Sequence, residues 1–168
     1  MTPAELLLDA LDRVEQGVEA VLDGLDAQAL AHRVGPDANP IGWLVWHLLR
    51  GQDVQVADVA GTEQVWTSGG WHERLDVPYD AAAMGYGQTS DEVGALHVDA
   101  AGLLGYSRAV HAATRSFVGA LSADDLDRVV DERWDPPVTL GVRLVSVIDD
   151  DVKHLGQAEY VRGLLPPR

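Results

Sequence analysis

The sequence predicts an all-α protein, a four-helix bundle with one long crossover between its second and third helices. Four long segments carry apolar residues at spacings of three and four, which is the repeat of an amphipathic helix. Residues 61–96, between the second and third segments, mix glycine, proline and aromatic residues without a sustained period. VPY at 77–79 and DRVVDERW at 127–134 could pair as strands, but we do not predict a sheet. The 168 residues suffice for one core, so we expect a single domain over 1–168.

The first helix is predicted from Pro3 to about Asp23. Thr2 suits its N-cap because a hydroxyl oxygen can accept a bond from a free amide of the first turn. Pro3 suits the first helical position, where the missing amide hydrogen costs nothing. The apolar residues that define the period are Leu7, Leu11, Val14, Val18, Val21 and Leu25.

The second helix is predicted to have Asn39 as N-cap and Pro40 at its first position, and to run to about Ala60. The crossover that follows is long for a compact domain, and such segments are usually functional or cover something. We therefore interpret it as a candidate lid or pocket wall. Its aromatic and histidine residues are Trp66, Trp71, His72, Tyr79 and Tyr86.

The third helix is predicted from about Val98 to Leu121. Ser122 then suits the cap of a short helical piece. The last long helix is predicted from about Thr139 to Leu164. Its stop signals are Gly163 and Pro166–Pro167.

Charge and composition exclude several classes of protein. There are 12 Lys and Arg against 27 Asp and Glu, a formal charge of −15, which repels phosphate backbones and anionic lipid head groups. We therefore expect no nucleic-acid or membrane partner, and a soluble, cytoplasmic protein, since no long apolar run is present either. The chain has no cysteine, so disulfides, thiolate metal cages and a protein thiol nucleophile are excluded. Any thiol chemistry must use a thiol from outside.

His47, Asp150 and His154 form a candidate metal site. Asp150 and His154 are four residues apart in the last helix, so they lie on one face, and His47 comes from the second helix. Two imidazoles and one carboxylate leave an open position, which is typical of catalytic rather than structural zinc. Spacing alone leaves two other interpretations open: Asp150 and His154 as a helix-surface ion pair, and His47 as a hydrogen-bonded core histidine.

Three segments resemble the DinB-like superfamily: NPIGWLVWHLLRGQD, then GGWHERLDVPYD with MGYGQTSDEV, and DDVKHLGQAEYVRGLL. The chain is most similar to an actinobacterial branch near the mycothiol-dependent maleylpyruvate isomerases and bacillithiol S-transferases. Members of the superfamily are four-helix bundles that bind a divalent metal through a histidine of the second helix and an H-x-x-x-H or E-x-x-x-H pair of the last. The resemblance implies that His47 and His154 are ligands. Asp150 stands where the family has His or Glu.

Aspartate at position 150 departs from the family pattern. Its side chain is one methylene shorter than glutamate, so it reaches a metal only with a helix tilt or through a bridging water. Asp149 and Asp151 are the alternatives, but each is rotated about 100° from Asp150 on the helix. We therefore keep Asp150 as the expected ligand.

The resemblance implies a metal-dependent thiol S-transferase or isomerase, in which a low-molecular-weight thiol of the mycothiol type attacks a small electrophile. Zinc is the first expectation for the metal, with nickel or iron as alternatives. A metal-dependent hydrolase and a non-catalytic, stress-related metal-binding bundle are the other hypotheses, and a homodimer is possible. On the helical wheel, Arg50 and Gln157 lie near the ligands and could orient them or bind a carboxylate, with Arg162 a weaker candidate. The expected pocket walls are Trp43, Trp71 and His72.

Overall fold

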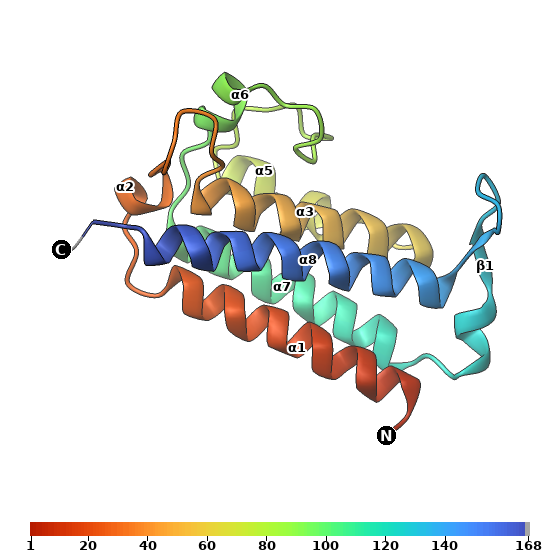
Figure 1. Ribbon diagram of the computed structural model, residues 1–168. Helices are drawn as coiled ribbons and strands as arrows, with labels where there is room; N and C mark the ends of the chain where they lie inside the picture. Colours follow the sequence, from red (N-terminus) through yellow and green to blue (C-terminus); the bar gives the residue numbers. More distant parts are fainter. Residues whose placement is uncertain (167–168) are drawn as a thin grey trace.

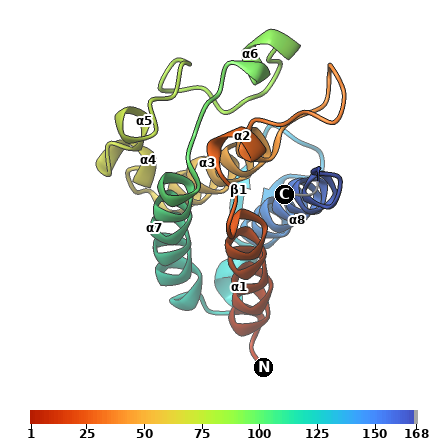
Figure 2. The same ribbon diagram turned by 90° about the vertical axis from the view of Figure 1, so that its left-hand side faces the viewer.

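The computed structural model describes residues 1–166 and is mostly helical (Figure 1). Its four long helices are α1 (Pro3–Leu22), α3 (Ile41–Ala60), α7 (Ala100–Gly119) and α8 (Leu140–Gly163). α1 and α8 run in one direction, and α3 and α7 run in the other. α3 packs along α8 and α7, and α1 packs along the same two helices from the other side (Figure 2). The predicted four-helix bundle is confirmed.

Side-chain caps set the helix starts largely where the sequence predicts them. Thr2 Oγ1 accepts a 3.2 Å bond from the amide of Glu5, and Glu5 Oε2 accepts a 2.7 Å bond from the amide of Thr2. Thr139 caps α8 through a single bond, which its hydroxyl oxygen accepts from the amide of Val142. The second helix differs: Pro40 has an extended backbone and is itself the N-cap, with no side-chain cap bond, so the expected Asn39 cap is wrong by one residue. α8 ends at Gly163, while the second proline of the predicted stop, Pro167, lies outside the described residues.

The connections contain short helices. α2 (Ala27–Leu30) lies between α1 and α3, and the long crossover between α3 and α7 holds α4 (Val65–Ser68), α5 (Trp71–Arg74) and α6 (Ser90–Gly94). Viewed along the bundle, the crossover lies over α3 and the start of α7 (Figure 2). It covers the side of α3 that faces away from the bundle. For this reason nearly the whole of α3 is buried, as expected for a helix packed on all sides.

A small hairpin, which the sequence did not predict, joins α7 to α8. After a short 3₁₀ helix (Asp124–Asp127), β1 (Val129–Asp131) pairs antiparallel with β2 (Val138–Thr139). The segment 77–79 takes no part in this sheet. The strands have too few residues to show a period of two, and pairing arises because residues 132–137 turn the chain back toward α8.

The core lies between the four long helices and continues under the crossover. Trp46 of α3 and Tyr106 of α7 are its largest fully buried aromatic residues. Burying a side chain of this size stabilises the fold by about 1.5–3 kcal/mol relative to leaving it exposed. Within residues 1–166, no helix is both long and apolar enough to cross a membrane.

Candidate metal centre

The structure brings His47, Asp150 and His154 together at the contact between α3 and α8. Each offers one ligand atom, and these atoms lie within 4.8 Å of one another. The rings of His47 and His154 meet edge to face with their centroids 4.6 Å apart, and His154 Nε2 lies 3.6 Å from Asp150 Oδ1. His47 is buried, while the other two side chains are half-buried. Antiparallel packing of α3 on α8 therefore places residues more than a hundred positions apart into one site.

Each histidine has one ring nitrogen fixed by a hydrogen bond. His47 Nδ1 donates to the carbonyl oxygen of Met84 in the crossover, and His154 Nδ1 donates to Oε1 of Gln157 at 3.1 Å. In both neutral rings the Nε2 atom is then the one with a free lone pair, so Nε2 is available to a metal. Gln157 thus lies where the sequence suggested, in position to orient a ligand.

Asp150 adds a carboxylate oxygen to the two histidines. Its Oδ2 is buried, lies 3.5 Å from where a methyl group on Gly51 would stand, and has no hydrogen-bond partner among the described residues. A buried carboxylate oxygen without a partner is costly unless a cation binds it. This donor set of two imidazoles and one carboxylate fits a divalent metal, because it suits zinc, nickel and iron alike.

The electrostatics favour the metal-binding form of His47. Burial is the largest effect on its imidazole and lowers the pKa. The hydrogen bond to Met84 raises the pKa, the charge of His154 lowers it, and the charge of Asp150 raises it. The net result is a neutral ring near neutral pH, and neutral imidazole is the form that binds metals.

Aromatic rings enclose His47 on two sides. The indole of Trp43 stacks on its imidazole with centroids 4.8 Å apart, and Tyr86 meets it edge-on at 5.2 Å. Trp43 is itself held by a 2.7 Å bond from Nε1 to Oε1 of Gln88. The crossover reaches this depth through Gly85, whose φ is +100° and where a methyl group would lie 2.8 Å from His47 Nδ1. Trp43 therefore lies against His47, where the sequence analysis expected a pocket wall.

Arg50 has a different place from the one expected. Its guanidinium is fully buried, bonds to the carbonyl of Ala83 at 3.3 Å and to Oε1 of Gln64 at 3.1 Å, and lies over the ring of Trp66. These contacts fasten the crossover to α3 instead of facing the three candidate ligands. Asp53, one turn further along α3, accepts bonds from two crossover amides at 2.7 and 2.9 Å and completes the anchor.

Trp71, His72 and Arg162 are not brought to the candidate centre. Trp71 is buried against Tyr106 and carries the guanidinium of Arg74 on its face. His72 bonds through Nε2 to the carbonyl of Tyr79 at 2.8 Å. Arg162 bonds to backbone carbonyls at the end of α1. All three stabilise the fold around the site.

The two neighbouring carboxylates on α8 also point elsewhere. Asp149 pairs with Lys153 at 2.6 Å on the exposed face. Asp151 is 1% exposed and points into the bundle, where burial and the charge of Asp150 raise the pKa of its carboxyl group well above the ordinary value. Of the three aspartates, Asp150 alone joins the histidines in the described part of the chain.

Sequence reasoning missed the parts of the site that come from the crossover backbone. Met84 contributes a carbonyl oxygen, which every residue has, and Gly85 contributes the absence of a side chain. Tyr86 was noted only as one of several aromatic residues in the crossover. The glycine beside two aromatic residues in MGYGQ is the one signal that could have indicated a close approach of the backbone.

The fold, with His47 of α3 meeting Asp150 and His154 of α8, is that of a DinB-like helical bundle. A family model described as mycothiol S-transferase matches residues 6–166, so the chain belongs to this DinB-like family. It is also similar to the crystal structure of a conserved protein from Enterococcus faecalis, with 32% identity, a TM-score of 0.90, and coverage of 98% of this chain and 97% of that chain. No match was found among curated proteins.

Proposed function

We propose that the protein is a metal-dependent thiol S-transferase or isomerase that uses a low-molecular-weight thiol of the mycothiol type and a small electrophile. His47, Asp150 and His154 would hold the divalent metal, with zinc as first expectation and nickel or iron as alternatives. Such a metal, when bound, lowers the pKa of a coordinated thiol so that the thiolate is present near neutral pH.

The observation that carries this proposal is that three atoms able to bind a metal lie close together without a hydrogen-bond partner in the described structure. Both Nε2 atoms are left free by the hydrogen bonds to Met84 and Gln157, and Asp150 Oδ2 is buried without a partner in the described residues. The chain supplies the remaining functions itself. Met84 and Gln157 hold the imidazoles in one tautomer, and Trp43 covers one face of His47 from water.

The absence of cysteine fits the same proposal. Because the chain has no cysteine, it cannot form a mixed disulfide with an external thiol, and no thiol of its own can take that thiol's place on the metal. The mycothiol S-transferase family match supports a thiol as one of the two substrates.

Metal content measured by plasma mass spectrometry, on protein purified without a polyhistidine tag, tests the ligand assignment. We expect near-stoichiometric metal in the native chain and its loss in His154→Ala and Asp150→Ala. Asp149→Ala is the matched control, because Asp149 is the adjacent carboxylate on the exposed face. Retention of metal in the first two variants would contradict the assignment.

Turnover with and without thiol then tests the reaction. The loaded protein is expected to consume an electrophile such as maleylpyruvate or a haloalkane derivative only when mycothiol is present. Thiol-independent turnover would instead indicate a hydrolase, and metal binding without turnover of any electrophile would indicate a non-catalytic protein.

A further inference from the structure

A cavity of about 370 Å³ lies between α3 and α7, on the side of α3 that is opposite to the candidate metal centre. Asp53 of α3 lines this cavity. Its position is turned about 200° around the helix from Gly51, the residue that faces Asp150. Neither of the two candidate histidine ligands, His47 and His154, is among the lining residues, and neither is Asp150. The cavity is therefore separate from the metal centre.

Small side chains leave this space between the two helices. α3 and α7 run in the same direction, and where they meet the hydroxyl of Tyr106 donates a 2.8 Å bond to Asp53. Further along, Ala57 and Ala60 of α3 and Ala113 of α7 line the cavity, and their methyl groups are too short to fill it. A volume of a few hundred Å³ suits a small molecule. The larger apolar side chains that form the walls are Val56, Val110 and Phe117.

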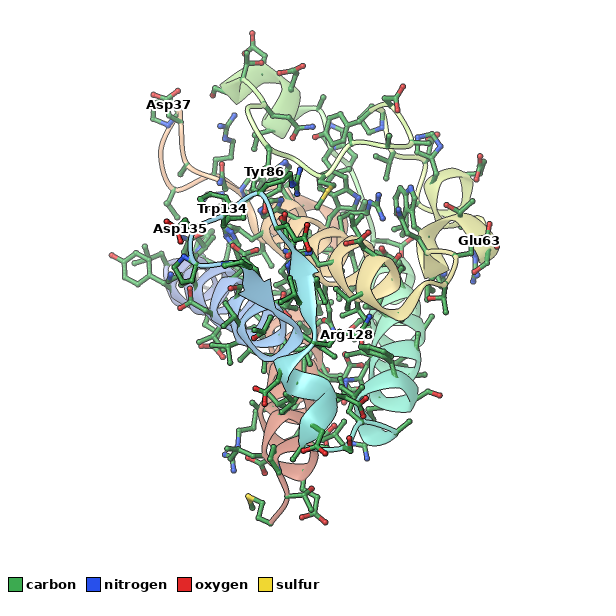
Figure 3. All side chains as sticks on the ribbon, turned by 90° about the vertical axis from the view of Figure 1, so that its right-hand side faces the viewer. Asp37, Glu63, Tyr86, Arg128, Trp134 and Asp135 are labelled. Atoms are coloured by element: carbon green, nitrogen blue, oxygen red, sulfur yellow. The ribbon has the colours of Figure 1, made fainter. Side chains whose placement is uncertain are left out.

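The turn after α3 forms the mouth of the cavity. Gly61 ends the helix with a φ of +67°, and the chain turns back so that Thr62 and Glu63 line the opening. Glu63 is exposed and lies at the outer edge of the molecule, well apart from Tyr86 at the metal centre (Figure 3). A ligand can thus enter here without passing the metal centre.

A buried carboxylate lies at the inner end of the cavity. Asp53 is 4% exposed, and its Oδ2 accepts bonds from the amide of Trp66 at 2.7 Å and from the hydroxyl of Tyr106. Its Oδ1 accepts one bond within residues 1–166, from the amide of Val65 at 2.9 Å. A carboxylate oxygen has two lone pairs, so Oδ1 can accept from a further donor. Arg50 offsets the charge of Asp53 only from 3.7 Å.

The other polar groups of the cavity are also acceptors. Glu63 adds a second negative charge at the mouth, and no lysine or arginine of the described chain is among the lining residues. Thr114 is buried, and its Oγ1 accepts a 3.0 Å bond from Gln52 and keeps a second lone pair. The net charge of −15 favours cations over the whole surface. A ligand that fits must therefore donate hydrogen bonds, carry positive charge and have an apolar body.

We infer that this cavity binds a small organic ammonium ion, with the ammonium group at Asp53 and Thr114 and the apolar body against Val56, Val110 and Phe117. An inorganic cation fits less well, because the walls are apolar and offer it few oxygen ligands. Asp53 keeps its bonds to the crossover amides when the ligand donates to Oδ1. The inference stands on this cavity alone and does not depend on the proposed thiol-transfer function.

Titration calorimetry of the purified full chain at pH 7 tests the inference with benzylamine as the probe. Benzyl alcohol and benzoate are the comparison compounds, because they have the same ring with a neutral and a negative polar group. Benzylamine is expected to bind about tenfold more tightly than benzyl alcohol, since hydrogen bonds between charged groups are the stronger ones, and benzoate more weakly than either. Equal binding of benzylamine and benzyl alcohol, or no binding of benzylamine, would overturn the inference.

Two substitutions examine the cavity itself. Ala113→Phe fills it from an exposed position of α7 and is expected to weaken benzylamine at least tenfold. Ala112→Phe is the matched control, because Ala112 is the exposed neighbour on α7 and does not line the cavity. Glu63→Gln should weaken benzylamine by about two- to fivefold, the size of an exposed ion pair, and leave benzyl alcohol unchanged. Unchanged benzylamine affinity in Ala113→Phe would contradict the assignment.

An amine can also bind a metal through its nitrogen lone pair, so the place of binding is measured separately. In nuclear magnetic resonance spectra, benzylamine should shift the amide signals of Val65 and Trp66, which are bonded to Asp53. His154→Ala should bind benzylamine as tightly as the native chain. Loss of binding in His154→Ala would place the amine on the metal and overturn the inference. A lack of thiol-dependent turnover would count against the proposed function and leave this result as it is.

Discussion

Asp150 and Asp151 are neighbours on α8 with opposite surroundings. Asp150 lies beside the two histidines at the half-buried edge of the helix, and Asp151 points into the core. A step of about 100° around the helix accounts for the difference. The residue that the sequence suggested as ligand is the one that meets the histidines, while its neighbour stands in a place where a carboxyl group is unfavourable.

Asp151→Leu is expected to stabilise the protein by about 1–3 kcal/mol at pH 7, because neither carboxyl oxygen has a partner in the described structure. The raised pKa has a further consequence. The folded state keeps a proton that the unfolded chain releases, so native stability falls as the pH rises above the ordinary value of 3.8 toward the folded pKa. Denaturant unfolding of the native chain and the variant between pH 4 and 8 measures both effects.

Asp151→Asn is the control for this prediction. It removes the titration and keeps the polar atoms, so it should abolish the pH dependence due to Asp151 and recover less stability than Asp151→Leu. A Leu variant less stable than the native chain at every pH would show that the carboxyl group has a stabilising partner.

At the scale of elements, the crossover completes the site that α3 and α8 begin. Its backbone reaches His47 because Gly85 adopts a positive φ and has no side chain. Arg50 and Asp53 of α3 hold the segment in place through its backbone groups. The crossover therefore forms part of the candidate centre and also covers it.

Gly85→Ala is expected to lower both stability, by about 1–3 kcal/mol, and metal affinity. The added methyl group would lie 2.8 Å from both His47 Nδ1 and a ring carbon of Trp43. To avoid this overlap, the backbone at Met84 must move, and His47 Nδ1 then loses the hydrogen bond that fixes its tautomer. Gly87→Ala is the matched control, because Gly87 also has a positive φ, +72°, but nothing lies within 4 Å of the new methyl. Thermal unfolding and competitive metal titration of the two variants compare them. Equal loss of metal affinity in both would contradict the role of Gly85.

The hairpin is tied to α8 through Asp131. Its hydrogen bonds with Arg133, together with the charges of Arg133 and Arg143, hold the pKa of this carboxyl group below its usual value of 3.8. A lowered folded pKa gives a stabilisation that is complete at neutral pH and is lost as the pH falls below 3.8 toward the folded pKa. Asp131→Asn should therefore reduce the unfolding free energy by a constant amount above about pH 5 and by less at lower pH. Asp124→Asn, on the exposed 3₁₀ helix, should show no such difference in denaturant unfolding.

At the scale of the whole molecule, periodicity was sufficient to predict the four long helices, whereas the meeting of His47 with Asp150 and His154 was expected from helical spacing together with the resemblance to the DinB-like superfamily. Apolar spacing determines which face of each helix is buried, and burial determines which residues face a neighbouring helix. The hairpin, the carbonyl of Met84 and the position of Arg50 could not be predicted in this way. They depend on where an aperiodic segment folds back, and this is decided by backbone contacts that carry no residue-type signal.

The candidate centre links two helices that are far apart in the sequence, because α3 precedes the crossover and α8 follows the hairpin. A metal that binds only the folded chain stabilises it by mass action, about 2.7 kcal/mol at a free concentration one hundred times its Kd. Zinc added to metal-free protein is therefore expected to raise Tm by several degrees, and a chelator to reverse the shift. In His154→Ala the zinc-dependent shift should disappear, while Asp149→Ala should keep it. A shift of equal size in both variants would mean that zinc binds elsewhere, for example to the many surface carboxylates of this acidic chain, and that α3 and α8 are held together by apolar packing alone.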